Sequence, residues 1–323
     1  MKICKTLPLL LIAILLLSYP KLNFGQAAPN LGAASGFALF TAAGAFNGTG
    51  SSTVTGDVGN DAGLFNAFPP GTLFGVKHVA DATSAQAKID VIAAYGALNQ
   101  IGIVLAVALG GQTLTPGVYF AGAASTLNGT LTLDAAGDPN AIFIIRIGGA
   151  FAEAVASSVN LINSASPCNV YWQINGQFDV AAGSSFSGTA IVNGAIHLLG
   201  SSSLSGRALS TTGEISLEDN TVYIPIPATP GVITGIQTQC PALAGQTYNI
   251  PAIATATTYS WTTPTGWSIT AGIGTNEITV TTGSAGQNGN VTVTAGNNCG
   301  TSAPGSLAVT VIPLPVTSLI YHN

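Results

Sequence analysis

Residues 173–221 read QINGQFDVAAGSSFSGTAIVNGAIHLLGSSSLSGRALSTTGEISLEDNT, and they repeat a three-part pattern about every 18 residues. Stacked in register, the segments form three columns: 178–180, 196–198 and 215–217; 185–188 and 203–206; 190–192 and 208–210. Turn residues such as Asn175-Gly176 and Asn193-Gly194 separate them. Three short strands per turn predict a β-solenoid of triangular section, in which each column forms one face.

Two of these faces have readable outer surfaces, because alternate side chains of a strand point to opposite sides. Along one face the expected outward residues are apolar and must be covered by another element: Ile144, Tyr171, Ile191 and Leu209. Along another they are mixed, as on an ordinary solvated surface: Gln177, Asp179, His197, Glu214 and Ser216. His197 has no second His or Cys on its ladder, so no metal site is predicted there.

A helix is predicted over 81–100, where the apolar residues follow helical spacing and Asp81, Thr83 or Ser84 can cap the first turn. The expected apolar stripe is Ala85, Ile89, Ile92, Tyr95 (or Ala93) and Leu98, with an apolar extension to Leu105. This helix is the natural cover for the apolar face, and we expect Arg146 and Arg207 at the margins of that contact.

The third face carries short hydroxyl and amide side chains and no charge. Its candidate residues are Thr53, Thr55, Thr126, Asn128, Ser158, Asn160, Ser185, Ser187, Ser203, Ser205 and Thr221. Such residues repeat about 7 Å apart along a strand and ~4.8 Å apart between strands, distances compatible with an ordered water lattice. The same pattern also suits a tight solenoid surface that binds nothing, and the ladder alone does not separate the two interpretations.

The segments outside the solenoid suggest an exported protein of two domains. Residues 1–27 have a basic start, a short apolar run and small residues at their end, as in a secretory signal; the alternative is a retained anchor. The solenoid is expected over 28–224, a Pro-rich linker over 225–230, an Ig-like β-sandwich over 231–313 and a tail over 314–323. We expect Cys240 and Cys299 to pair within the sandwich, and Cys168 to be a small buried hydrophobe.

The composition excludes several classes of partner. Charged residues are 6% of the chain, and only Lys77, Lys88, Arg146 and Arg207 remain beyond residue 27 against twelve acidic residues. So few cations argue against nucleic acid and against anionic membrane surfaces. We expect no cofactor, no membrane insertion after signal cleavage, and a monomer.

Short motifs spread over residues 30–224 resemble the secreted ice-binding (antifreeze) proteins of cold-adapted bacteria and fungi. They are 30–38 (NLGAASGFA), 85–95, 114–119 (LTPGVY), 131–135, 141–144, 169–173 (NVYWQ) and 206–210. The resemblance implies a discontinuous right-handed β-solenoid with one long helix alongside. It also implies adsorption to ice, with growth and recrystallisation inhibited. Residues 231–312 resemble Ig-like or polycystic-kidney-disease-like (PKD-like) repeats of exported bacterial proteins.

Two other functions fit a β-solenoid. Polysaccharide lyases and hydrolases require clustered carboxylates, or a basic residue beside a metal, and the acidic residues here are scattered along the sequence. A secreted or surface adhesin that binds a glycan would show exposed aromatic residues. An exposed Trp267 would give the C-terminal domain such a contact with a glycan or a cell surface.

Overall fold

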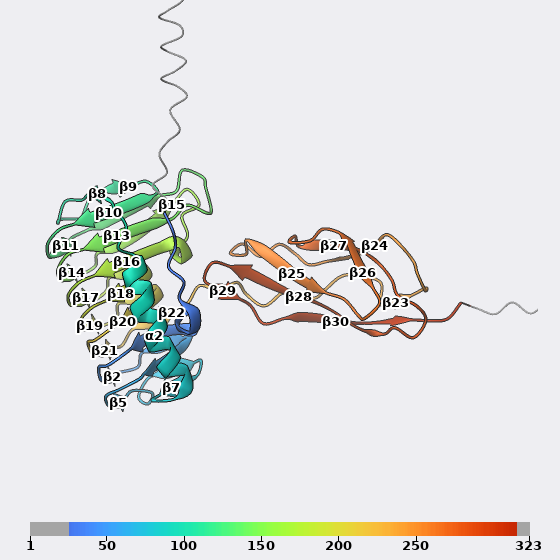
Figure 1. Cartoon of the computed structure of the whole chain (residues 1–323), viewed down its shortest axis with the longest axis horizontal. Helices are drawn as coiled ribbons and strands as arrows, with labels where there is room; N and C mark the ends of the chain where they lie inside the picture. The colour runs from blue at the N-terminus through green and yellow to red at the C-terminus, as the bar shows by residue number, and fades with distance from the viewer. Residues whose placement is uncertain (1–25, 315–323) are drawn as a thin grey trace, which may run out of the picture.

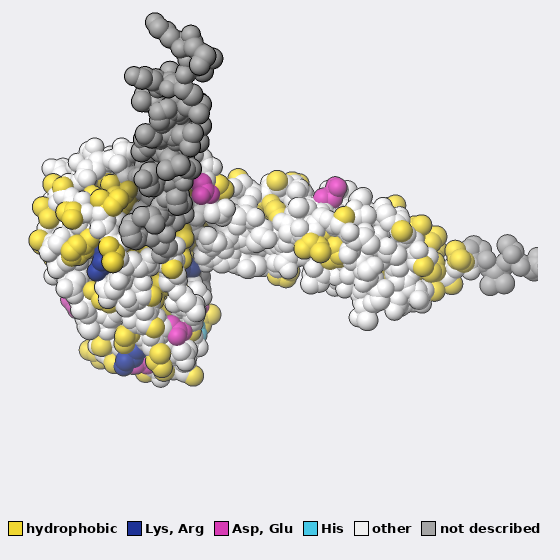
Figure 2. Space-filling view, turned by 45° about the horizontal axis from the view of Figure 1, so that its top comes forward, with side chains coloured by type: hydrophobic (Ala, Val, Ile, Leu, Met, Phe, Trp, Pro, Cys, Tyr) yellow, Lys and Arg dark blue, Asp and Glu magenta, His cyan; other side chains and the backbone are white. Residues whose placement is uncertain are grey.

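The computed structural model describes residues 26–314, which form a coil of short strands and a sandwich that projects from its side (Figure 1). Most of the expected signal, up to residue 25, and the tail beyond Leu314 lie outside the described residues. Figure 2 shows a surface on which charged side chains are sparse, in keeping with the composition.

The coil has three faces of parallel strands stacked from turn to turn. The helix-covered face contains β8 (Ile103–Val104), β10 (Gly117–Ala121), β13 (Phe143–Ile147), β16 (Val170–Ile174), the second halves of β18 (Ser185–Val192) and β20 (Ser203–Ser210), β1 (Phe37–Thr41), β4 (Asp57–Asn60) and β7 (Lys77–Val79). The mixed face contains β11 (Ser125–Leu127), β14 (Phe151–Glu153), β17 (Phe178–Val180), β19 (Ile196–Leu198), β21 (Ile215–Glu218), β2 (Phe46–Thr49) and β5 (Phe65–Asn66). The hydroxyl face contains β9 (Thr113–Leu114), β12 (Thr130–Asp134), β15 (Ser158–Ile162), the first halves of β18 and β20, β22 (Thr221–Tyr223), β3 (Thr53–Thr55) and β6 (Thr72–Phe74).

The order of turns in space differs from their order in sequence. β1 pairs with the second half of β20, so that Leu39 lies beside Ala208. The first two turns of the chain therefore stack beneath its last turn, and α2 (Ala82–Ala97) carries the chain along the coil to the other end, where β8 begins the remaining turns (Figure 1). This is the discontinuous solenoid that the family resemblance implied.

Helix α2 begins with a reciprocal cap. The Asp81 carboxylate accepts a hydrogen bond from the backbone N–H of Ser84 at 2.8 Å, and the Ser84 hydroxyl accepts one from the backbone N–H of Asp81 at 2.8 Å. These bonds satisfy backbone donors that the first turn leaves unpaired. A short 3-10 helix, η1 (Gly32–Gly36), packs beside α2.

Helix α2 covers the predicted face, but with a different stripe. It buries Ser84, Ala87, Val91 and Ala94 against a cluster that contains Ile144, Tyr171, Ile191 and Leu209. The predicted Ile89 and Ile92 instead point to solvent, with 60% and 50% of their surface exposed. The stripe prediction was right for Leu98, which is buried in this cluster, and for Tyr95, which packs against it. It was wrong for Ala85, Ile89 and Ile92 because the helix is apolar on two sides, and its smaller side chains allow a closer approach to the sheet.

The interior of the coil is filled by aromatic and aliphatic side chains that stack between turns. Phe151 stacks on Trp172 and on Phe178, with ring centroids 5.4 Å and 5.6 Å apart. Trp172 is fully buried, as its inward position in the pattern predicted. Regular stacking of large side chains keeps the turns in register and the outer faces regular.

The C-terminal domain is a two-layer sandwich. One layer contains β23 (Thr238–Gln239), β25 (Thr258–Thr262), β28 (Gly289–Asn297), β29 (Gly300–Thr301) and β30 (Gly305–Val311). The other contains β24 (Gln246–Asn249), β26 (Ser268–Ala271) and β27 (Glu277–Thr281). Trp261 and Trp267 are both buried between the layers. The hypothesis that Trp267 offers an exposed stacking surface was therefore wrong.

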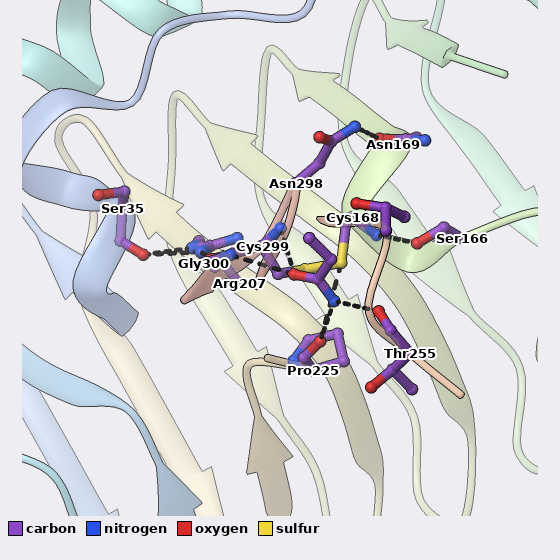
Figure 3. Close-up of a disulfide and its surroundings, with 12 residues drawn as sticks. Ser35, Ser166, Cys168, Asn169, Arg207, Pro225, Thr255, Asn298, Cys299 and Gly300 are labelled. Carbon is purple, nitrogen blue, oxygen red and sulfur yellow. Dashed lines mark hydrogen bonds between the residues drawn. A yellow bond between two sulfur atoms is a disulfide. The ribbon is translucent and has the colours of Figure 1, made fainter. Parts of the chain in front are cut away.

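A disulfide joins the two domains, and it is not the predicted one. Cys168, in the 3-10 helix η2 (Pro167–Asn169) ahead of β16, bonds to Cys299 in the turn between β28 and β29 (Figure 3). Cys240 is free and exposed. Cys240 follows β23, and β23 pairs with the last residues of β30, where Gln239 lies beside Val311. Cys299 lies beyond the other end of β30, because the first residue of β30, Gly305, pairs with Val293 and the chain continues from there toward Cys299. Cys240 and Cys299 thus occupy opposite ends of the domain and cannot meet.

Polar contacts fix the junction around this disulfide (Figure 3). Arg207, only 2% exposed, donates hydrogen bonds to the carbonyl oxygens of Ser35 (2.7 Å) and Cys299 (2.6 Å). Asn298 donates to the Asn169 side chain at 2.6 Å, and Asn297 donates to the Pro225 carbonyl at 2.8 Å. Burial lowers the pKa of Arg207 to about 10, which leaves the guanidinium charged at neutral pH. Arg207 therefore links the two domains and does not lie at the margin of the helix contact, where it was predicted from the sequence. Arg146 does lie at that margin, where it donates hydrogen bonds to Gln100 and Asn99 at the end of the helix.

Peptide mapping under non-reducing conditions is expected to recover the peptide that contains Cys168 joined to the one that contains Cys299. Cys240 should react with an alkylating reagent before any reductant is added, because its thiol is exposed and unbonded. Recovery of Cys240 joined to Cys299 would contradict this arrangement.

Candidate functional site

The outer surface of the hydroxyl face begins with an unbroken file of hydroxyl side chains, one from each of seven consecutive turns. Strand pairing places these residues directly beside one another, and we call them the first file: Thr72, Thr53, Thr221, Ser203, Ser185, Ser158 and Thr130. None of the seven is buried. Neighbouring hydroxyls also bond along the file, Ser203 to Ser185 at 3.1 Å and Thr130 to Ser158 at 3.0 Å. Because a hydroxyl can donate once and accept twice, each keeps capacity for water.

A second file runs parallel to the first, two residues further along each strand. In the same turn order it contains Phe74, Thr55, Tyr223, Ser205, Ser187, Asn160 and Thr132, followed by Thr113. The residues between the two files point into the core, and Val54, Val222, Leu204, Phe186, Val159 and Leu131 are all buried. The two files thus form one surface backed by a packed interior.

A glycine ends each central segment of this face. Gly188 and Gly206 follow Ser187 and Ser205, and both have positive φ, at 117° and 141°. A Cβ on Gly206 would stand 2.0 Å from the Gly188 carbonyl oxygen. Glycine therefore lets β18 and β20 bend from the hydroxyl face onto the helix-covered face, which explains the repeated Ser-x-Ser-Gly pattern.

Most predicted site residues lie together on this face, and two do not. Thr126 belongs to β11 and pairs with Ala152 on the mixed face, while Asn128 lies in the turn after β11. The residues of that turn in the two files are Thr130 and Thr132. The error arose because 125–132 contains two similar hydroxyl-apolar triplets, and the insertions at 134–140 and 163–169 remove the 18-residue spacing that would choose between them.

The sequence interpretation also missed Thr72, Thr113, Thr130 and Thr132. The signal was present in Thr130-Leu131-Thr132, which has the same hydroxyl–apolar–hydroxyl form as Thr53-Val54-Thr55. Behind the first file, buried Ser52, Ser157, Ser184 and Ser202 line the corner toward the mixed face. The Ser157 hydroxyl donates to the Leu127 carbonyl at 2.9 Å, and Ser184 bonds similarly to Ala154. Such bonds tie successive turns together beneath the file.

The mixed face presents a different chemistry. His197 Nδ1 lies 2.8 Å from Asp179 Oδ1, and its Nε2 lies 3.7 Å from Glu214 Oε1. The remaining outward residues of this file are Thr126, Ala152, Ser216, Asn47 and Asn66. Within residues 26–314, no group of three His, Cys, Asp or Glu side chains is placed to hold a metal ion.

The C-terminal domain meets the coil at the corner between the hydroxyl face and the helix-covered face, since Cys168, Arg207 and Pro225 all lie there. A cleft of about 490 Å³ separates Thr55 and Phe74 from residues 297–301 of the sandwich. A second cleft of about 710 Å³ separates Ser205 and Tyr223 from residues 254–257. The second file therefore borders the sandwich along four neighbouring strands.

Comparison with known proteins identifies the class and the family. A model described as Ice-binding-like matches residues 40–223, and a PKD-like domain model matches residues 226–309. The chain is 35% identical over 197 residues to an ice-binding protein of Nostoc sp. (strain HG1), covering 59% of this chain and 72% of that protein.

Solved structures agree. The crystal structure of an ice-binding protein from the Antarctic ascomycete Antarctomyces psychrotrophicus gives a TM-score of 0.59 and 31% identity, over 61% of this chain and 98% of that one. That of an ice-binding protein from an Antarctic Flavobacteriaceae bacterium gives 0.58 and 41%, over 68% of this chain and 51% of that one. The fold thus defines a β-solenoid protein with an attached PKD-like sandwich. The chain belongs to the Ice-binding-like family, which confirms the resemblance found in its sequence.

Proposed function

We propose that this chain is a secreted protein that adsorbs to ice through its hydroxyl face and thereby inhibits ice growth and recrystallisation. The observation that carries the proposal is the first file, seven unburied hydroxyl side chains in direct register. Related proteins of the same fold are named as ice-binding proteins, which supports the same role here.

The chemistry of the face suits a crystalline water surface. Its two files carry no charged residue, so water near them is not drawn into the strongly oriented shells that ions impose. The hydroxyls are spaced ~4.8 Å apart from turn to turn and can hold an ordered water layer, and the threonine methyl groups add apolar contact. Adsorption then depends on many weak contacts across a broad surface, and no single pocket is required.

We also propose that the protein is not an enzyme and needs no cofactor. The acidic residues are spread over several parts of the coil: Asp134 lies at the end of β12 and Glu153 in the coil interior. Asp179 and Glu214 flank His197 on the open mixed face and line neither of the two clefts described above. The glycan-adhesin alternative loses its main support, because both tryptophans of the sandwich are buried. Among residues 26–314, no helix is long and apolar enough to cross a membrane.

The mixed face is the second candidate for the ice-contacting surface, because it is also open. The sandwich leaves the coil at the corner opposite the mixed face, so no other part of the described chain stands in front of that face. Its His197 and Asp179 side chains, whose nearest polar atoms are 2.8 Å apart, are larger and more varied than the short hydroxyls, so this face fits ordered water less well than the hydroxyl face does. We therefore place ice contact on the hydroxyl face and use the mixed face as the comparison surface.

The experiment is ice shaping and thermal hysteresis of the purified chain from residue 28 onward, with folding checked by circular dichroism. Faceted crystals and a gap between melting and freezing points are expected. Round crystals that grow freely in the presence of folded protein would overturn the proposal and return the glycan adhesin to consideration.

A further inference from the structure

The two files of the hydroxyl face differ in what stands opposite them. Phe74 and Thr55 line one cleft against the sandwich, and Tyr223 and Ser205 line the other. These four residues come from four neighbouring strands, β6, β3, β22 and β20. No residue of the first file lines either cleft. These four residues of the second file therefore face the sandwich across clefts that water can enter.

The sandwich is fixed to the coil beside these clefts by covalent and polar contacts. The Cys168–Cys299 disulfide brings the two Cα atoms within 4.9 Å across the junction. Buried Arg207 bonds to the carbonyl oxygens of Ser35 and Cys299, and Asn297 and Asn298 add bonds to Pro225 and Asn169. A covalent link surrounded by buried and partly buried hydrogen bonds leaves the sandwich little freedom to move away from the coil.

Side-chain size follows the same division. The first file contains only Ser and Thr, and the second file beyond the clefts contains only short residues: Ser187, Asn160, Thr132 and Thr113. The two bulky members of the second file, Phe74 and Tyr223, each line a cleft beside the sandwich, with 62% and 41% of their surface exposed. An aromatic ring in the middle of a contact surface would hold a flat crystal away, whereas a ring at the edge beside the sandwich leaves the rest of the surface open.

From these observations we propose that the C-terminal domain forms a fixed border of the ice-contacting surface. Ice meets the whole first file and the part of the second file beyond the clefts, while Thr55, Phe74, Tyr223 and Ser205 make no contact with it. This inference rests on the proposed function of the hydroxyl face. It adds that the PKD-like sandwich limits the area of that face that ice can contact.

The test compares three substitutions of threonine by tyrosine in the full chain. Thr53 and Thr55 lie on the same strand, one in each file, and Thr132 lies in the second file beyond the clefts. We expect Thr53→Tyr to lose most thermal hysteresis and Thr132→Tyr to lose it several-fold. Thr55→Tyr should retain the thermal hysteresis of the parent protein, because its ring enters the cleft. The melting temperature of each variant checks that it is folded.

The outcomes separate this inference from the function on which it rests. A loss in Thr55→Tyr as large as that in Thr53→Tyr would overturn the border while leaving the hydroxyl face in place. Retained activity in all three variants would remove the hydroxyl face as the ice-binding surface, and the border with it. Loss of activity in Thr53→Tyr and Thr132→Tyr alone supports the proposal.

Discussion

Tyrosine in place of Ser203 is expected to abolish ice shaping while leaving the fold intact. Ser203 lies in the middle of the first file, between Ser185 and Thr221, and its side chain points outward. A phenol ring there would project beyond the hydroxyls on either side and separate a flat crystal from the rest of the file. Because adsorption depends on simultaneous contacts across the surface, one such obstacle removes most of them at once. Thermal hysteresis and crystal shape measure the loss.

Stability should change little, because the side chain at this position need not enter the core. Substitutions at outward positions away from buried features usually alter the free energy of unfolding by no more than about 0.5 kcal/mol. The Ser203–Ser185 hydrogen bond is lost, but the Ser185 hydroxyl is exposed and can bond to water instead. Thermal unfolding of Ser203→Tyr beside the parent protein tests this.

Ser216→Tyr is the matched control, since Ser216 lies outward on the mixed face, beside His197 and Asn47. This variant should keep full thermal hysteresis. The reverse result, with activity lost in Ser216→Tyr and kept in Ser203→Tyr, would move the ice-binding surface to the mixed face. A conservative variant, Ser203→Thr, keeps the hydroxyl and adds a methyl group, so its activity should be equal to or above that of the parent protein.

How far the sequence predicts this surface depends on the regularity of the repeat. Between residues 178 and 221 the spacing is nearly constant, and the predicted pairs Ser185–Ser203 and Ser203–Thr221 are found in the structure. Thr53 and Thr55 could also be placed, because the Gly after Thr55 marks the same bend. Thr126 and Asn128 were misplaced where insertions break the spacing, since no local signal then fixes which triplet occupies which face.

The helix and the disulfide show two other limits. Hydrophobic periodicity predicted α2 and the face that it covers. It could not predict which side of the helix is buried, because both sides are apolar. Packing against Ile144 and Ile191 buries Ala87 and Ala94 and leaves Ile89 and Ile92 exposed. The disulfide could not be predicted from domain boundaries because it crosses them, joining residues 131 positions apart. That bond, with the hydrogen bonds of Arg207, Asn297 and Asn298, holds the sandwich beside the second file and so forms the clefts.

The second large effect, on the stability of the fold, is expected from substitution of a buried carboxyl group that has no hydrogen-bond partner among the described residues. Glu153 points into the coil, is 6% exposed, and neither of its oxygens has a hydrogen-bond partner among the described residues. Its neighbour on the adjoining strand is Leu127, an apolar residue. Burial raises the pKa of Glu153 from 4.5 to about 8, so that the side chain is largely neutral in the folded protein at pH 7.

This shift makes stability depend on pH. A carboxyl whose pKa is higher in the folded protein than in the unfolded chain favours folding below the unfolded pKa. That advantage is lost as the pH rises through the folded pKa, because the unfolded chain ionises first. The loss for Glu153 therefore falls between about pH 4.5 and pH 8. At about 1.4 kcal/mol per pH unit, it amounts to a few kcal/mol.

Glu153→Leu should remove this dependence and stabilise the protein, with the larger gain at higher pH. The leucine matches Leu127 in the same inward file and leaves no polar group unpaired. Urea denaturation at pH 5 and pH 9 measures the difference: the parent protein should lose stability relative to the variant between the two. Glu153→Gln is the control, because it removes the charge but keeps a buried polar group, and so should flatten the pH dependence without the full gain. An equal advantage of Glu153→Leu at both pH values would contradict a carboxyl held neutral by burial.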